Sequence, residues 1–156
     1  MSKISKISPK RIRKIRGGKD PTLIVEKCMI RRGFDPGSCL QQRSADIAQW
    51  LVPIGEDEDL EITLEGLSRS AETTLYMGIN VYSIPLIDAQ RTLVAALQVA
   101  DTLIGAKLSL VNYDVVLSTT VYAEELGVEE VDYYFELLMH QKTSVQEGIA
   151  QELASE

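Results

Sequence analysis

The stretch LEITLEGL, residues 60–67, decides the fold class of this chain. Apolar residues at 60, 62 and 64 alternate with polar residues at 61, 63 and 65, which is the period of a strand buried on one face. After a short turn, TTLYMGINVYS at 73–83 repeats the alternation. The two stretches therefore predict neighbouring strands of a sheet with one apolar face and one solvated face.

The sequence on either side adds further strands to this pair. Residues 44–54 fit either a short helix or a strand; we favour the strand, because the acidic run 56–59 makes a solvated connection into the strand at 60. Farther along, KLSLVNYDVVLSTTVY at 107–122 alternates on both sides of Asn112-Tyr113-Asp114 and predicts a hairpin. About five antiparallel strands are expected.

Three helices are predicted around these strands. Asp20-Pro21 opens a helix over 21–32 that Gly33 closes, and the segment FDPGS that follows is turn material. Asp88 is expected to cap a helix over 89–106, with an apolar stripe of Leu93, Leu97, Ala100 and Ile104. A last helix begins near Gly127 and runs almost to the end, with a possible break at Thr143-Ser144.

Charge is distributed unevenly along the chain. Residues 1–19 hold eight of the sixteen Lys+Arg and no acid, so this +8 subtracted from the formal −7 leaves −15 for residues 20–156. A segment this charged and this poor in apolar surface does not fold alone. We expect residues 1–19 to be a flexible basic arm and residues 20–156 a single α+β domain.

The arm is the clearest functional element in the sequence. Its candidate partner-binding residues are Lys10, Arg11, Arg13, Lys14 and Arg16. They could contact an acidic protein surface, whether of this chain, a neighbouring subunit or a partner, or they could neutralise phosphates of nucleic acid or bind a membrane surface. The arm has no aromatic residue for base stacking, which disfavours sequence-specific recognition of single strands.

A second candidate surface lies on the predicted strand at 73–83. Tyr76 and Tyr82 flank Gly78 on one face of that strand, which fits a tentative partner-binding platform. Aromatic neighbours on a sheet are also common in ordinary packing.

The chain carries no recognisable catalytic constellation. Its one histidine, His140, has at most Glu136 as a helical neighbour, and Cys28 and Cys39 lack the spacing of a zinc or redox site. The acidic clusters at 56–59, 124–125 and 129–130 lie at the ends of predicted elements, where carboxylates solvate turns and favour helix N-termini. Gly17-Gly18 does not follow a predicted strand, which excludes a phosphate-binding loop. We expect no enzyme activity, no cofactor and no metal.

Composition indicates where the protein works. No apolar run reaches the length of a membrane span and the N-terminus lacks a secretory signal, so we expect a cytoplasmic protein with reduced thiols and no membrane insertion. The short acid-free N-terminus could alternatively be an organellar transit peptide.

The predicted order is helix, three strands, helix, two strands, helix, an α+β domain with an antiparallel sheet packed against helices. This order resembles the fold of type III secretion chaperones and YbjN-like proteins. Three stretches carry the resemblance: 60–83, DAQRTLVAALQVADTLIG at 88–105, and 107–138. It implies a homodimer without a cofactor that binds extended segments of another protein. We therefore predict a protein-binding adaptor or chaperone-like protein; the alternative is a nucleic-acid-associated or assembly protein anchored by its arm.

Overall fold

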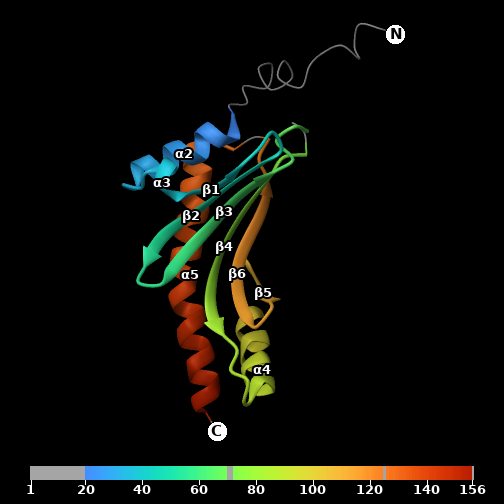
Figure 1. Ribbon diagram of the computed structural model, residues 1–156. Helices are drawn as coiled ribbons and strands as arrows, with labels where there is room; N and C mark the ends of the chain where they lie inside the picture. Colours follow the sequence, from blue (N-terminus) through green and yellow to red (C-terminus); the bar gives the residue numbers. More distant parts are fainter. Residues whose placement is uncertain (1–19, 70–71, 125, 156) are drawn as a thin grey trace, which may run out of the picture. The chain divides into compact units, whose positions relative to one another are not determined.

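The structure is a computed structural model that describes residues 20–69, 72–124 and 126–155. Its elements are shown in Figure 1 and run in this order: α2 (Pro21–Arg31), α3 (Pro36–Cys39), β1 (Leu40–Arg43), β2 (Ile47–Gly55), β3 (Glu58–Glu65), β4 (Thr74–Ser83), α4 (Ala89–Ala100), β5 (Lys107–Val111), β6 (Asp114–Tyr122) and α5 (Val128–Ala154). The predicted α+β class is confirmed.

The described strands form one sheet of six strands in the order β1-β2-β3-β4-β6-β5. At one edge β1 pairs antiparallel with β2, and at the other β5 pairs antiparallel with β6. The ambiguous segment 44–54 contributes strand β2, as favoured. The hairpin is also confirmed: β5 and β6 are joined by a turn at Asn112, whose φ of 56° is one that asparagine tolerates well.

The expected count of five strands is wrong by one, because the segment after Gly33 does more than turn. Asp35 accepts a hydrogen bond from the Gly37 amide at 3.2 Å and caps the four-residue helix α3. Leu40–Arg43 then pairs with β2, with a register shift between Leu40 and Gln42. Such a short strand depends on its partner, since it carries no apolar alternation of its own.

The chain packs as two compact units. Counting only the described residues, the first comprises 20–52, 61–69, 72–76, 120–124 and 126–133, and the second comprises 53–60, 77–119 and 134–155. The expectation of a single domain over 20–156 stays a prediction, and the arm at 1–19 lies outside the described residues.

The core of the first unit is built from α2 and from the alternating strands. Asp20 caps α2 by accepting a hydrogen bond from the Thr22 amide at 3.0 Å, and Pro21 occupies the first turn, as expected. Gly33 follows the helix with a φ of +86°, a conformation that favours glycine. The largest fully buried side chains here are Val25, Met29, Trp50, Ile62, Leu64 and Leu75.

In the second unit, α4 ends at Ala100, six residues before the predicted end, and lies beside β5. Asp88 holds the N-cap position, but it has a left-handed φ of 60° and its side chain makes no capping hydrogen bond. Helix α5 runs through Thr143-Ser144 without the possible break. The largest fully buried side chains are Leu60, Met77, Ile79, Leu117, Leu138 and Ile149.

The buried face of α4 is its small-residue face. Ala95, Ala96 and Val99 are buried, whereas Leu97 is 71% exposed and Ile104, beyond the helix end, is 81% exposed. Close packing against α5 explains this choice, because a Cβ atom added at Gly148 would lie 3.0 Å from Cγ2 of Val99. The apolar stripe predicted from the sequence is therefore partly solvent-exposed.

Substitutions at Gly148 should reveal this close contact. Gly148→Ala gains about 1 kcal/mol of helix propensity but must displace Val99, so we expect a net change within about 1 kcal/mol. Gly148→Leu should lower the free energy of unfolding by about 1–3 kcal/mol, and adding Val99→Ala should restore part of it. Urea denaturation measures these changes, and Glu147→Leu on the exposed face serves as control. If Gly148→Leu lowered the free energy of unfolding equally with and without Val99→Ala, the close contact between Gly148 and Val99 would be contradicted.

Candidate protein-interaction surfaces

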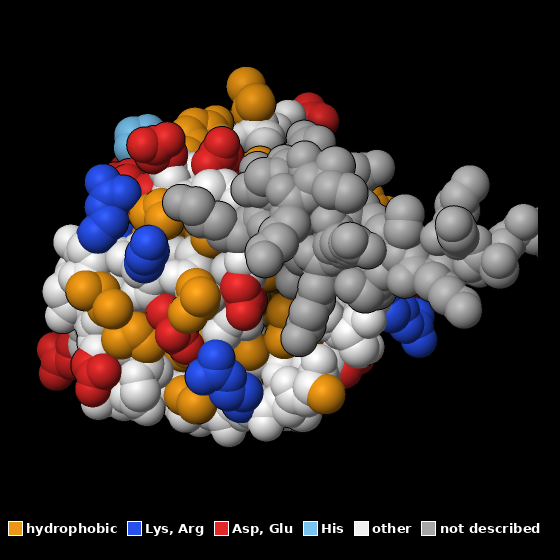
Figure 2. All heavy atoms as spheres, turned by 90° about the horizontal axis from the view of Figure 1, so that it is seen from above, with side chains coloured by type: hydrophobic (Ala, Val, Ile, Leu, Met, Phe, Trp, Pro, Cys, Tyr) orange, Lys and Arg blue, Asp and Glu red, His pale blue; other side chains and the backbone are white. Residues whose placement is uncertain are grey.

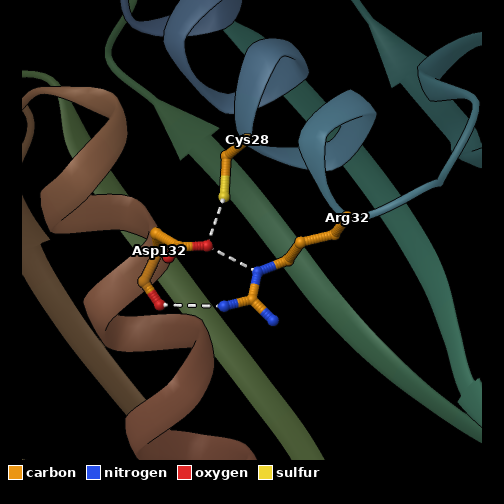
Figure 3. A network of polar contacts seen from close by, with 3 residues as sticks. All are labelled: Cys28, Arg32 and Asp132. Carbon is orange, nitrogen blue, oxygen red and sulfur yellow. Dashed lines mark hydrogen bonds and ion pairs between the residues drawn. The ribbon is translucent and has the colours of Figure 1, made fainter.

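Cys28 of α2 and Arg32, the C-cap residue that follows α2, converge on Asp132 in the first turns of α5 (Figure 3). Arg32 Nε donates to Asp132 Oδ1 at 2.7 Å, and Arg32 Nη2 donates to the Asp132 carbonyl oxygen at 3.4 Å. The Cys28 thiol lies 3.8 Å from the same Oδ1. The cluster contains a carboxylate and a thiol, which could serve as a base and a nucleophile, but the thiol is almost fully buried and out of reach of a substrate. We therefore interpret the cluster as a structural clamp between α2 and α5.

The environment of Cys28 suppresses its reactivity. Burial raises the pKa of the Cys28 thiol, the nearby Asp132 carboxylate raises it further, and Arg32 opposes them. Because the thiolate is the nucleophile, a raised pKa leaves little reactive form near neutral pH. Cys28 and Cys39 are not joined in a disulfide, and both are buried.

We expect both thiols to resist alkylation until the protein unfolds. In the native protein, iodoacetamide should modify Cys28 no faster than the chain opens, and in urea both thiols should react at the rate of a model thiol. Raising the pH should accelerate the unfolded thiols first, since the folded pKa of Cys28 is the higher one. Mass spectrometry of timed samples measures this, and rapid modification of native Cys28 would contradict it.

A groove of about 640 Å³ lies between α2 and the residues that lead into α5. We call it the α2–α5 groove. Leu23 and Ile30 stand on its α2 side and are 56% and 61% exposed, although the same helix also supplies core residues. Its other lining residues are Asp20, Ile24, Glu26, Lys27, Leu126, Gly127, Val128, Glu129 and Glu130.

The rim of this groove is acidic and partly fixed by local contacts. Glu130 accepts a hydrogen bond from the Gly127 amide at 2.9 Å, as in a helix-capping arrangement. Glu26 lies 3.4 Å from Arg43, an ion pair that is partly exposed. The groove thus combines apolar surface with carboxylates, which suits an amphipathic cationic segment.

The predicted platform on β4 falls into different environments. Tyr76 is half-buried and lines a shallow hollow with Glu61, Thr63, Glu65, Thr74 and Thr120, where Gln49 Nε2 and Thr63 Oγ1 donate to Glu61 Oε1 at 2.8 and 2.9 Å. Gly78 is buried, and Tyr82 is half-buried in the other compact unit. Their role in partner binding stays a prediction.

The second unit exposes apolar residues on α4 and β5. Val94, Leu97 and Leu110 are about half exposed or more, and Val111 at the end of β5 is 51% exposed. A small apolar cavity of about 80 Å³ lies between the two elements, lined by Leu93, Ala96, Leu97, Ala100, Leu108, Ser109, Leu110 and Val115. We call these exposed residues the α4–β5 face.

The remaining candidates from the sequence are dispersed or outside the described residues. Lys10, Arg11, Arg13, Lys14 and Arg16 all lie in the part of the chain that the structure does not describe. His140 is exposed on α5. Within 20–69, 72–124 and 126–155, no group of three or more His, Cys, Asp or Glu is placed to hold a metal ion.

Two further surface properties are visible. On the face drawn in Figure 2, hydrophobic side chains lie interspersed with acidic and basic ones, without a large area of one sign among the described residues. None of the described helices combines the length and the hydropathy that crossing a membrane requires.

Comparison with known proteins places the fold. No family model matches this chain, and no curated protein matches it in sequence. A chain in the structure of the HopA1-SchA chaperone-effector complex is similar, with 15% identity and a TM-score of 0.51 over 81% of this chain and 92% of that one. A chain in the crystal structure of the ExsC-ExsE complex is similar at 16% identity and a TM-score of 0.53, over 80% and 89%. The predicted resemblance to type III secretion chaperones is thus confirmed at the level of the fold.

Proposed function

We propose that this protein is a non-enzymatic, chaperone-like protein that binds a segment of another polypeptide. The observation that carries the proposal is the shared fold with chains of chaperone-effector and ExsC-ExsE complexes over four-fifths of this chain. The exposed apolar side chains of the α4–β5 face support it, and so, separately, do those of α2, because exposed apolar patches commonly mark an interaction site.

The partner segment is proposed to lie on the sheet face around Tyr76, and Gly78 and Tyr82, in the other compact unit, stay candidate partner-binding residues. The hollow beside Tyr76 offers an aromatic ring for packing and the carboxylates of Glu61 and Glu65 for cationic or amide groups. Aromatic side chains of this kind often dominate the binding energy of an interface.

Retention of a partner from cell lysate tests the role of Tyr76. The amount of partner retained by Tyr76→Ser should be at least about tenfold lower than the amount retained by the native protein. A loss of this size is expected of a residue that anchors an interface. Tyr113→Ser is the matched control, since Tyr113 is 68% exposed and lies outside the hollow. Equal retention by both variants would remove Tyr76 from the site, and a reproducible metal- or cofactor-dependent turnover would overturn the non-enzymatic role.

The basic arm is proposed to contact an acidic protein surface through Lys10, Arg11, Arg13, Lys14 and Arg16. Replacing all five by Gln should weaken partner retention while the melting temperature stays nearly unchanged, because an arm outside the core contributes little to folding. Loss of several kcal/mol of stability would contradict this. Retention of duplex DNA, with a log–log salt slope near 0.9 for each phosphate contact, would favour the nucleic-acid-associated alternative.

The protein is also proposed to form a homodimer through the α4–β5 face. Its apolar residues are exposed, and β5 is an edge strand of the sheet, so its backbone groups can pair with a second copy. Light scattering at micromolar concentration should give twice the chain mass, and Leu97→Arg should give a monomer that still unfolds cooperatively, with a melting temperature lowered by the lost association. Gln98→Arg beside it is the control. A native monomer at every concentration would remove the dimer and leave the fold unaffected.

A further inference from the structure

The α2–α5 groove leaves apolar surface uncovered next to an acidic rim. Leu23 and Ile30 are each more than half exposed, although the opposite face of the same helix is buried in the core. Covering such side chains with another apolar group is favourable by roughly 25 cal/mol for each Å² removed from water. A groove of this kind favours an occupant that brings its own apolar side chains.

Charge specifies the occupant further. The groove is lined by four carboxylates, Asp20, Glu26, Glu129 and Glu130, and by Lys27, which gives 1 − 4 = −3. The N-termini of α2 and α5 contribute partial positive charge of about 0.5 each, so the groove stays negative. Because Glu26 already faces Arg43, the charge available to an occupant comes mainly from the other three carboxylates.

A segment with both required properties directly precedes the groove in the sequence. Residues 10–16 read KRIRKIR, with Ile12 and Ile15 set among five cations and no acid. The isoleucines match the apolar floor, and the cations match the rim. No ligand class foreign to this chain is needed to explain the groove.

Chain length permits the contact. Asp20 lines the groove and is bonded to Lys19, and the intervening Gly17-Gly18 tolerates the backbone conformations of a sharp reversal. Helix α2, with 11 residues, is about 16 Å long, whereas seven residues extended at about 3.3 Å each span about 23 Å. Residues 10–16 can therefore reach along the whole groove.

We propose that, in the absence of a partner, residues 10–16 dock in the α2–α5 groove of their own chain. Ile12 and Ile15 cover Leu23 and Ile30, and the arm's cations face Asp20, Glu129 and Glu130. The inference rests on one part of the proposed function, namely that the arm acts through charge. Its new content is the acidic surface that the arm contacts when no partner is bound.

Paramagnetic relaxation in the full, partner-free chain tests this docking. A nitroxide is attached to Ser8→Cys, and the methyl signals of isotope-labelled Leu and Ile residues are recorded. We expect loss of the Leu23 and Ile30 signals and retention of the Leu97 and Ile104 signals. Raising the ionic strength from about 0.1 M to about 1 M shortens the Debye length from about 10 Å to about 3 Å and should restore the lost signals in part. Native protein taken through the same labelling reports any reaction at the buried Cys28 and Cys39.

Two variants and one mixture complete the experiment. Glu129→Gln should reduce the broadening at Leu23 and Ile30, whereas Glu147→Gln on the same helix should not, since Glu147 is exposed outside the groove. Equal broadening of all four methyl signals, or none at Leu23 and Ile30, would overturn the inference. So would broadening that appears only between spin-labelled and isotope-labelled molecules in a mixture, because the occupant would then be a second copy's arm. If docking fails while the five-Gln variant still loses its partner, the inference is wrong and the proposed function stands.

Discussion

Trp50→Ala should lower the free energy of unfolding by about 3–5 kcal/mol, the usual effect of removing a large aromatic side chain from a packed core. Trp50 is completely buried and is the largest of the buried side chains. A globular domain is stable by only about 5–15 kcal/mol, so this variant should lie close to its unfolding threshold.

Trp50→Phe should behave differently, because the indole N–H has no hydrogen bond to lose among the described residues. Within the described residues, Trp50 Nε1 is buried without an acceptor. Replacing the indole removes that unsatisfied donor, a gain of about 1–3 kcal/mol that offsets much of the smaller cavity. We expect a net loss below about 1.5 kcal/mol.

Circular dichroism in urea measures both variants, since Trp50 is the only tryptophan and its fluorescence is lost with it. Tyr122→Ala is the control, because Tyr122 is 74% exposed and its removal should cost no more than about 0.5 kcal/mol. An equally large loss in Trp50→Phe would show that the indole N–H is satisfied, for instance by an internal water.

Asp132→Ala should lower the free energy of unfolding by about 1–3 kcal/mol, because Arg32 then loses a charge-assisted hydrogen bond where water reaches it poorly. The Arg32 side chain is only 19% exposed, whereas Asp132 is 42% exposed, so solvent screens part of the interaction and we expect less than for a fully buried pair. Asp132→Asn keeps an oxygen acceptor and should cost less.

Urea denaturation of Asp132→Ala, Arg32→Leu and the double variant gives the coupling energy of the pair. The matched control is Glu72→Ala, which breaks the Arg69–Glu72 pair, whose side chains are 74% and 70% exposed. That loss should fall between about 0 and 1 kcal/mol. Similar losses at Asp132 and Glu72 would mean that the clamp between α2 and α5 contributes no more than a surface ion pair.

The sequence predicts the strands of this fold better than its helix faces. A period of two residues is unambiguous in β3 and β4, since shifting the register by one residue would move every apolar side chain to water. The period of α4 locates a helix, but it does not say which side is buried. Ala95 and Ala96 face the core because small residues permit close helix packing, and this leaves Leu97 outside.

The elements missed by the sequence are those stabilised by distant residues. Helix α3 and β1 have four residues each and no apolar period, so β1 forms through its pairing with β2. The groove and the clamp join α2 to residues about a hundred positions later, which no local pattern indicates. The one available signal was that Cys28 and Arg32 are four residues apart and therefore share a helix face.

The two edges of the sheet differ, and the difference limits how copies of this chain can assemble. Edge strand β1 is short, mostly polar and interrupted in register, which makes it a poor template for another strand. Edge strand β5 pairs in unbroken register with β6 and exposes Leu110 and Val111. Pairing of two copies through β5 would use the one extendable edge of each molecule, so edge-to-edge pairing of this kind would stop at two copies and would not extend into a fibre.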